Sequence, residues 1–599
     1  MKKDRQDLNG EAKDRLADFN RDPVIWKLSF LALMIGIMSA FIAYALVWLI
    51  KVITNLAFYQ QFSSAFHSPA GHHLGYGVIF VPAVGGLIIG LMARYGSEKI
   101  RGHGIPEALE AILMGQSRMD PKVAFLKPVS SAISIGTGGP FGAEGPIIMT
   151  GGAFGSLFAQ FFHLTSAERK TLLVAGAAGG MAAIFATPIA AVLLSVELLL
   201  FEWKPRSFIP VALASITAGM LRVKLFGPGP MFTVVPHAVP GGHEMMMALV
   251  VGILAGLCSS LLTVMVYGFE DAFRKLPIHW MWWPAIGGLL VGIGGLVDPR
   301  VLGVGYDVIQ DLLSGHLVGT ALVVLLMAKA LVWCLALGSG TSGGVLAPLL
   351  IIGGAVGALE AHWIPMGDTS LWVMLSMAAI MGGTMRAPLT AFIFALELTH
   401  DFNLMSALFI SCVAAYAVTV FLKRRSILTE KIARRGLHIT REYSIDPLEL
   451  MRVGEVMDKD VQTVPARMTA AEFMDLMALN HEGLMKHRGI PIVDEQGCLA
   501  GMVTREDIMK ASRASPQMTV AELGSRDLVV TYPDELVRDA LNKMLDAGVG
   551  RLPVVSRQDA RRVIGYLGRP SVFMAWMRRL EEEKKRQIIW DRKFAFNRR

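Results

Sequence analysis

The sequence has few cysteines and few charged residues. Its four cysteines are far apart in 599 residues, at Cys258, Cys334, Cys412 and Cys498. This spacing predicts neither a disulfide framework nor a CxxC-type metal site. Charged residues make up only 18% of the chain, whereas soluble domains have roughly 25%. The composition therefore argues against an ordinary soluble protein and gives no indication of metal or redox chemistry.

Long hydrophobic runs take the place of the missing charge. Hydrophobic residues make up 53% of the chain, and residues 28–50 and 245–269 contain no charged side chain. Each run is close to the ~20 residues that cross a bilayer. A polar segment of mixed charge precedes the first run and no small-residue cleavage site follows it, so we do not expect a cleaved signal peptide. The sequence predicts a polytopic integral membrane protein.

Positive charge is concentrated near the ends of the chain. The net charge is +8, and the main basic clusters are "KRRSILTEKIARRG", from Lys423, and the tail from Met577. Basic segments beside membrane spans face the cytoplasm. We therefore expect both termini in the cytoplasm and the protein in the plasma (inner) membrane. Neither cluster belongs to a recognisable nucleic-acid fold, so nucleic acid is not an expected partner.

The pattern of the sequence changes near Gly436. Before this point, apolar segments are short and interrupted by glycine and proline, and such irregular backbone survives in a membrane only where protein or a water-filled cavity satisfies it. After it, strand-like and helical segments alternate in two similar copies. The predicted fold is an all-α polytopic membrane domain with broken helices, followed by a soluble α/β pair.

The membrane part contains an internal repeat. "GAEGPIIMTGGAFG", from Gly142, aligns without a gap with "GVLAPLLIIGGAVG", from Gly344, at an offset of 202 residues. "ATPIAAVLLSVEL" aligns with "RAPLTAFIFALEL" at an offset of 200 and pairs Pro188 with Pro388 and Glu197 with Glu397. Duplicated halves with interrupted helices are typical of transporters, whose binding site lies at the repeat interface.

Three glycine- and proline-containing helix starts are candidates for an anion site. They read "GHGIPEAL", "GAEGPIIM" and "GGVLAPLL". A helix N-terminus has unpaired N–H groups and about half a positive charge, so several together bind an anion without a full cation. Glu144 is the only charged residue from Gly136 to Gly152, and its carboxylate is a tethered anion that competes for these groups. The alternative is a helix-capping glutamate with no transport role.

These elements carry a resemblance to a known family. "GHGIPE" (102–107), "GAEGP" (142–146), "GGVLAP" (343–348) and "SILTEKIARRG" (426–436), in this order, resemble the signature of the CLC chloride channels and transporters. The tail resembles a tandem pair of cystathionine-beta-synthase-type (CBS) domains. The resemblance implies a chloride-transporting homodimer with one pathway per subunit. The expected domains are a cytoplasmic segment (1–24), a membrane domain (25–436), a linker (437–452), CBS domains (453–512 and 513–578) and a basic tail (579–599).

The resemblance also implies roles for individual residues. Glu144 matches the gating glutamate, which occupies an anion site when ionised and moves away, or is protonated, to admit chloride. The anion-binding residues it implies are Gly102, His103, Gly104, Ile105, Pro106, Gly142, Gly145, Pro146, Gly344, Val345, Leu346 and Leu428.

Four of these positions depart from the family's pattern. His103 replaces the serine that coordinates chloride, so that either its imidazole donates instead or the backbone amides act alone. Val345 and Leu346 replace an Ile-Phe pair and keep a hydrophobic wall. Leu428 replaces the tyrosine of the inner gate, and the missing hydroxyl predicts a pathway that is less tightly closed or less selective for chloride.

The family's exchangers use a second, internal glutamate, and here its position aligns with Leu198. Glu197 comes one residue earlier, which turns a helical side chain by about 100°. Glu197 is a candidate proton relay, but its repeat mate Glu397 suggests a structural use shared by both. The sequence therefore favours passive chloride conduction, with proton-coupled exchange as the alternative.

The CBS pair suggests regulation. "GMVTREDI" (501–508) resembles the nucleotide-binding signature, with Thr504 and Asp507 at the positions that contact phosphate and ribose, whereas the second copy has Gly568 and Ser571. Adenine nucleotide is the candidate ligand, and a dimerising module is the alternative. Transport itself requires no cofactor and no metal, and we expect no enzyme activity. A sensor with a structural membrane anchor is a third class, but it does not explain the duplicated broken helices.

Overall fold

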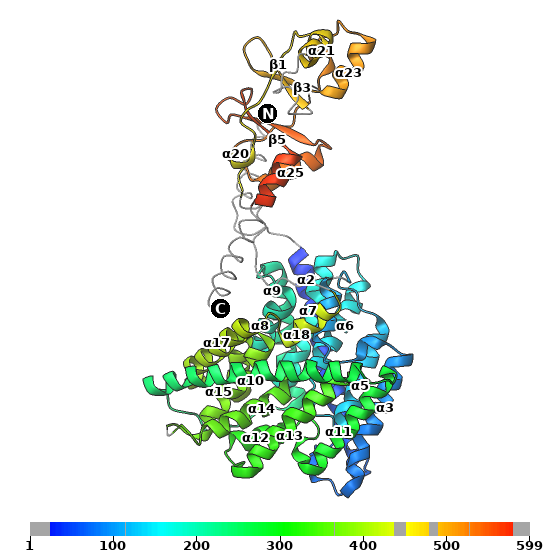
Figure 1. Ribbon diagram of the computed structural model, residues 1–599, viewed down its shortest axis with the longest axis vertical. Coiled ribbons are helices and arrows are strands. Elements are labelled where there is room, and N and C mark those ends of the chain that lie inside the picture. Colours follow the sequence, from blue (N-terminus) through cyan, green and yellow to red (C-terminus); the bar gives the residue numbers. More distant parts are fainter. Residues whose placement is uncertain are drawn as a thin grey trace. The chain divides into compact units, whose positions relative to one another are not determined.

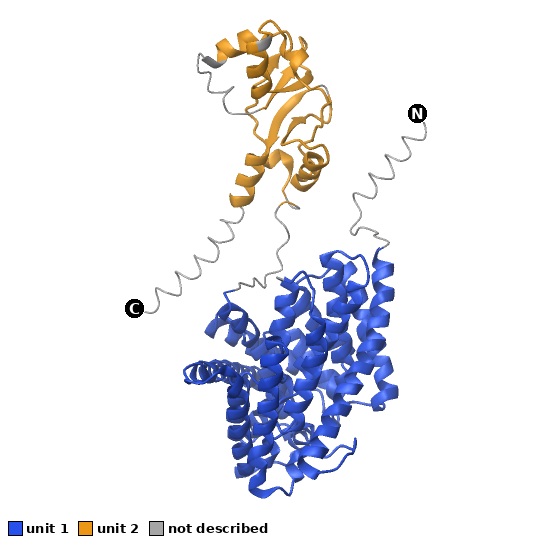
Figure 2. Cartoon of the chain, turned by 90° about the vertical axis from the view of Figure 1, so that its right-hand side faces the viewer, with its two compact units in different colours: residues 1–442 blue, residues 443–599 orange. Residues whose placement is uncertain are grey.

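The computed structural model describes residues 24–113, 115–364, 366–436, 448, 451–478, 489–525 and 527–578. The chain forms two compact units, residues 1–442 and 443–599 (Figure 2). The expected N-terminal segment before residue 24, most of the expected linker and the tail after residue 578 lie outside the described residues.

The first unit is built from helices (Figure 1). Its α-helices are α2 (Val24–Tyr59), α3 (Phe80–Tyr95), α4 (Ile105–Leu113), α5 (Pro121–Gly136), α6 (Glu144–Gln160), α7 (Ser166–Phe185), α8 (Pro188–Leu194), α9 (Pro205–Phe226), α10 (Gly242–Arg274), α11 (Trp283–Val297), α12 (Tyr306–Leu313), α13 (Gly319–Gly338), α14 (Leu346–Glu360), α15 (Thr369–Met385), α16 (Pro388–Thr399), α17 (Met405–Leu422) and α18 (Ile427–Arg434). Short turns of 3₁₀-helix lie between them: η1 (Pro69–Gly71), η2 (Gly75–Ile79), η3 (Glu98–Ile100), η5 (Trp280–Trp282), η6 (Pro299–Val301) and η7 (Phe402–Leu404). A π-helix, η4 (Ser195–Leu200), extends α8.

Within the described residues, seven helical segments are long and apolar enough to cross a membrane. The helices at the repeated motifs are shorter, among them Pro188–Leu200, Leu346–Glu360 and Pro388–Thr399. Proline at the first position of α8 and α16 starts both helices, because its missing N–H costs nothing there. The sequence prediction of a polytopic membrane domain with broken helices is confirmed.

The two repeated halves have the same local geometry. Helix α6 packs against α7 in the first half, and α14 packs against α15 in the second. Both α7 and α15 are buried along nearly their whole length, as expected of helices that are apolar on every face. Each ends at a residue in the left-handed region, Ala186 (φ 60°) and Arg386 (φ 57°). The core of this unit is therefore a duplicated helix arrangement.

The second unit contains two small sheets. Strands β1 (Val464–Pro465), β2 (Gly489–Val493) and β3 (Leu499–Thr504) form one sheet in that order, with β1 and β2 parallel and β2 and β3 antiparallel. Strands β4 (Arg551–Val555) and β5 (Val563–Gly568) form an antiparallel pair. The helices are α20 (Val453–Val456), α21 (Ala470–Ala478), α23 (Arg505–Ala514), α24 (Val520–Leu523) and α25 (Val537–Asp546).

The two α/β modules exchange their first helices. Val453, on α20, is buried in the core that contains Leu552 and Leu567 of the β4–β5 sheet. Val520, on α24, is buried in the core that contains Ile490 and Val503 of the β2–β3 sheet. Each module thus depends on a helix that precedes the other module in the sequence, and the pair folds as one unit.

Candidate anion site

The three motifs predicted from the sequence meet in space. The N–H of Gly344 donates to the carbonyl oxygen of Gly142 at 2.9 Å, and the N–H of Gly343 donates to that of Gly102 at 3.4 Å. Gly142 and Gly344 form an isolated antiparallel bridge, one of the points where the two halves touch. The starts of α4, α6 and α14 therefore converge on one place.

Glycine is required where these backbones approach each other. A Cβ atom on Gly145 would lie 2.0 Å from the carbonyl oxygen of His103, and one on Gly344 would lie 2.5 Å from that of Gly142. Gly102 and Gly104 have φ values of +81° and +88°, a region that other residues rarely adopt. The glycines of the motifs thus allow three helix starts to pack without side chains between them.

Glu144 is buried at this meeting point. Its residue is 0% exposed, and its Oε1 accepts a hydrogen bond from the N–H of Ala347 at 3.1 Å. Ala347 lies in the first turn of α14, so the acid of the first half binds the helix N-terminus of the second. Glu144 Oε2 is buried without a hydrogen-bond partner among the described residues. The carboxylate occupies a place where helix N–H groups favour an anion.

The other residues that the sequence predicted for the site are buried as well. His103 is 2% exposed, and neither ring nitrogen has a hydrogen-bond partner within the described residues. Leu428 is 0% exposed on α18, where the hydroxyl of Tyr267 donates to the carbonyl of Ile427 at 2.5 Å. The remaining buried positions are Gly102, Gly104, Ile105, Pro106, Gly142, Gly145, Pro146, Gly344, Val345 and Leu346.

Lys127 is a residue of this site that the sequence interpretation missed. It is 0% exposed on α5, and its Nζ donates to the carbonyls of Ile100 (2.8 Å) and Gly102 (2.7 Å) and to the hydroxyl of Ser342 (3.0 Å). The lysine thus ties the first motif to the residues just before the third. A lone cation in the apolar run "FLKPVSSAISIG" was the available signal.

Glu197 and Glu397 have matching roles in the two halves. Glu197 accepts hydrogen bonds from the N–H groups of Leu389 (3.1 Å) and Thr390 (2.9 Å), at the start of α16. Glu397 accepts from those of Ile189 (3.0 Å) and Ala190 (2.8 Å), at the start of α8. Each glutamate therefore caps the broken helix of the opposite half.

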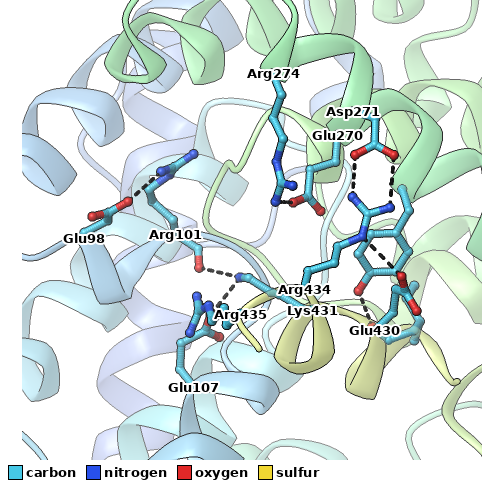
Figure 3. Close-up of polar contacts among 12 residues, drawn as sticks. Glu98, Arg101, Glu107, Glu270, Asp271, Arg274, Glu430, Lys431, Arg434 and Arg435 are labelled. Atoms are coloured by element: carbon cyan, nitrogen blue, oxygen red, sulfur yellow. Dashed lines mark hydrogen bonds and ion pairs between the residues drawn. The ribbon is translucent and has the colours of Figure 1, made fainter. Parts of the chain in front are cut away.

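A polar cavity of about 490 Å³ reaches His103 from the side of α18. Lys431 of α18 pairs with Glu107 at 2.7 Å, and Arg434 pairs with Asp271 at 2.5 Å (Figure 3). The guanidinium of Arg101 lies 4.4 Å above the ring of Trp280. The lining includes six lysine and arginine residues (Lys99, Arg101, Arg274, Lys431, Arg434 and Arg435) and three glutamates (Glu98, Glu110 and Glu270), so the cavity is polar and has an excess of positive charge that attracts anions.

The CBS residues predicted to contact nucleotide lie at the start of α23. The Thr504 hydroxyl accepts from the N–H of Asp507 at 3.2 Å, and the Asp507 carboxylate accepts from the N–H of Thr504 at 3.3 Å. The pair forms a capping box, which stabilises the helix start. Asp507 is exposed and Thr504 is partly exposed, so both remain accessible from solvent.

Comparison with known families agrees with this geometry. The family described as "Voltage gated chloride channel" matches residues 85–420, and the CBS domain matches residues 453–514 and 520–576. The chain is 30% identical to the "Voltage-gated ClC-type chloride channel ClcB" of Shigella flexneri over 368 residues, which are 60% of this chain and 87% of that protein. It is 27% identical to the "Putative chloride channel protein ClcB-like" of Ralstonia nicotianae over 366 residues, 59% of this chain and 85% of that one.

Solved structures have the same fold. A slow cyanobacterial Cl⁻/H⁺ antiporter matches with a TM-score of 0.62 and 20% identity, covering 68% of this chain and 97% of that one. A eukaryotic CLC transporter matches with a TM-score of 0.57 and 18% identity over 92% and 98% of the two chains. Because the family match covers more than half of the sequence, the chain belongs to the voltage-gated chloride channel (CLC) family of chloride-transporting membrane proteins and carries a C-terminal pair of CBS domains.

Proposed function

We propose that this protein conducts chloride passively through a pathway gated by Glu144. The observation that carries the proposal is the hydrogen bond from the N–H of Ala347 to the buried Glu144 carboxylate, at the meeting point of three helix starts. A permeant anion needs the same donors. The ionised side chain therefore competes with chloride, and its departure or protonation opens the site.

The surroundings of Glu197 support conduction without proton coupling. Its carboxylate is engaged with two backbone N–H groups and with the hydroxyl of Thr390 at 2.6 Å. Leu198, the residue that aligns with the exchangers' inner glutamate, is buried and cannot carry a proton. Glu144 therefore has no evident titratable partner at that inner position.

Paired chloride and proton fluxes in proteoliposomes test this function. Acid protonates Glu144 and removes its charge, so wild-type chloride flux should rise as the pH falls. Glu144→Gln should give a flux several-fold above wild type at neutral pH, with little pH dependence, because the amide is a weaker competitor for the N–H groups. Unchanged flux and an unchanged pH response in Glu144→Gln would contradict a gating role for Glu144.

Proton-coupled exchange is the second candidate, since Glu144 is a titratable group inside the pathway. In this mechanism Glu144 exchanges protons with one side and Glu197 relays them to the other. Uphill proton movement driven by a chloride gradient would favour exchange. Absence of such proton movement would contradict exchange. Absence of any ion flux from folded protein would instead favour a sensor with a structural membrane anchor.

We also propose a homodimer in the inner membrane, with cytoplasmic termini. All three motifs of the site come from one chain, which supports one complete pathway in each subunit. Cross-linking of the purified protein in detergent tests the dimer, and accessibility of a cysteine introduced at position 599 tests the orientation. A monomer, or labelling from outside, would contradict the respective part.

The CBS pair is proposed to bind an adenine nucleotide at Thr504 and Asp507. Calorimetric titration of the full chain with ATP should show binding that Asp507→Ala weakens about tenfold, because a carboxylate–hydroxyl contact to ribose is lost. A Ser571→Ala variant is the matched control in the second copy. No heat of binding with wild-type protein would favour a purely dimerising module.

A further inference from the structure

The second half of the membrane unit contains a copy of the first anion loop. Gly303, Val304, Gly305 and Tyr306 follow Gly102, His103, Gly104 and Ile105 by 201 residues. Gly303 and Gly305 have φ values of +67° and +75°, close to the +81° and +88° of Gly102 and Gly104. Both loops therefore have the same backbone form, and each leads directly into a short helix, α12 or α4.

The copy includes the buried lysine. Lys329 follows Lys127 by 202 residues. It is 0% exposed on α13, and its Nζ donates to the carbonyls of Val301 (2.8 Å) and Gly303 (3.4 Å). Lys127 makes the matching contacts with Ile100 and Gly102. The second loop is thus held in the same way as the first.

The second loop also approaches the pathway. A Cβ atom on Gly305 would lie 2.7 Å from Cδ1 of Ile351 on α14, the helix whose first turn binds Glu144. In the first half, Gly104 lies against Met149 of α6, and Ile351 is the repeat mate of Met149. In the view of Figure 1, α12 lies below α14 and α18 lies above it. The copied loop therefore contacts α14 from the α12 side, whereas the cavity at His103 is bounded by α18.

Tyr306, at the end of this loop, has a side-chain hydroxyl that can donate a hydrogen bond. Its hydroxyl oxygen is inaccessible to solvent and has no hydrogen-bond partner among the described residues. Its ring packs edge-on against Phe185 and Phe232, with centroids 6.4 and 6.3 Å apart. Oε2 of the Glu144 carboxylate is likewise buried and lacks a partner within the described residues.

We propose that the Tyr306 hydroxyl is an anion ligand of the pathway, donating to the permeant chloride or to the Glu144 carboxylate once it leaves Ala347. Binding of the displaced carboxylate rests on the proposed gating role of Glu144, whereas binding of chloride does not. Asp307, the next residue, places a carboxylate in the first turn of α12, so the hydroxyl rather than the helix N-terminus supplies the contact.

Tyr306→Phe tests the proposal because it removes the hydroxyl and keeps the ring. We expect the chloride concentration for half-maximal flux in proteoliposomes to rise about tenfold, the loss of one hydrogen bond to an anion. Tyr59→Phe is the matched control, since the Tyr59 hydroxyl donates to the carbonyl of Ser68 at 2.6 Å at the end of α2. The control should keep the wild-type value.

The same substitution in a Glu144→Ala background separates the two anions. If Tyr306 binds chloride, the tenfold rise persists without Glu144; if it binds the displaced carboxylate, the rise disappears and only the pH profile of the single variant shifts. An unchanged half-maximal concentration and an unchanged pH profile in Tyr306→Phe would overturn the proposal. A different result would contradict the gating role of Glu144: unchanged flux and unchanged pH response in the Glu144→Ala variant alone.

Discussion

The two halves of the membrane unit share a scaffold and differ in their charge at the site. The repeat mate of Glu144 is Leu346, and both residues begin a helix, α6 and α14. Lys127 and Lys329, and Glu197 and Glu397, keep both their chemistry and their contacts across the repeat. Features present in both halves hold the backbone in place, whereas the acid present in only one half is the proposed competitor of the permeant ion.

A second asymmetry lies one residue further along. Gly145 in the first half corresponds to Ala347 in the second. The first needs to be glycine because the His103 carbonyl lies against it, whereas the second has room for its methyl group and uses its N–H to bind Glu144. The two positions thus differ in how closely the opposite backbone packs against them, and exchanging these residues tests the comparison.

Gly145→Ala should have the largest effect. Its Cβ atom would meet backbone rather than a flexible side chain, and such overpacking costs about 1–3 kcal/mol or more. We expect loss of chloride flux together with a lower thermal unfolding temperature. Ala347→Gly, the matched change, should cost no more than about 1 kcal/mol. Equal effects of the two substitutions on unfolding would contradict the assigned asymmetry.

Lys127→Met and Lys329→Met compare the two buried lysines. Each change removes the lysine donor from two buried carbonyl groups, and a buried group left unsatisfied costs about 1–3 kcal/mol. Both variants should unfold at lower temperature by similar amounts. Lys127→Met should reduce chloride flux more, because its loop carries His103 at the site. A larger flux loss from Lys329→Met would contradict the prediction that the loop held by Lys127 matters more for chloride flux.

Glu197→Gln and Glu397→Gln should have the smallest effects. Each amide keeps one acceptor for the opposite helix start, so a loss of about 0.5–2 kcal/mol is expected, as for other N-caps. The two variants should match each other in unfolding temperature and leave chloride flux near wild type. A selective loss of proton movement in Glu197→Gln, with none in Glu397→Gln, would identify Glu197 as a relay and break the symmetry.

Much of this site could be predicted from short-range patterns. Hydropathy predicted the membrane unit, the ordered glycine motifs predicted the helix starts, and the lone acid predicted Glu144. The two glutamates were paired by the repeat, but their partners could not be predicted, since Glu197 contacts residues almost two hundred positions away. Lys127 was visible as a lone cation in an apolar run, but its partners were not, because two of its acceptors are backbone carbonyls and the third is the distant Ser342 hydroxyl.

The CBS unit shows the same limit. Its two α/β copies were visible as alternating strands and helices, yet α20 and α24 pack into each other's modules. A short helix with one or two apolar residues fits either core equally well by pattern. Long-range packing decides between them, because burial depends on the shape of the whole core.

The sequence by itself determined that this chain spans a membrane, that its membrane part is duplicated, and that one half carries an acid where the other carries leucine. These follow from composition and spacing, which act locally along the chain. Only the tertiary structure decided that Glu144 binds the N–H of Ala347, that each capping glutamate serves the opposite half, and that the Tyr306 loop reaches α14. Such contacts depend on how the two halves pack against each other, because the donors to these carboxylates are backbone N–H groups, which almost every residue has.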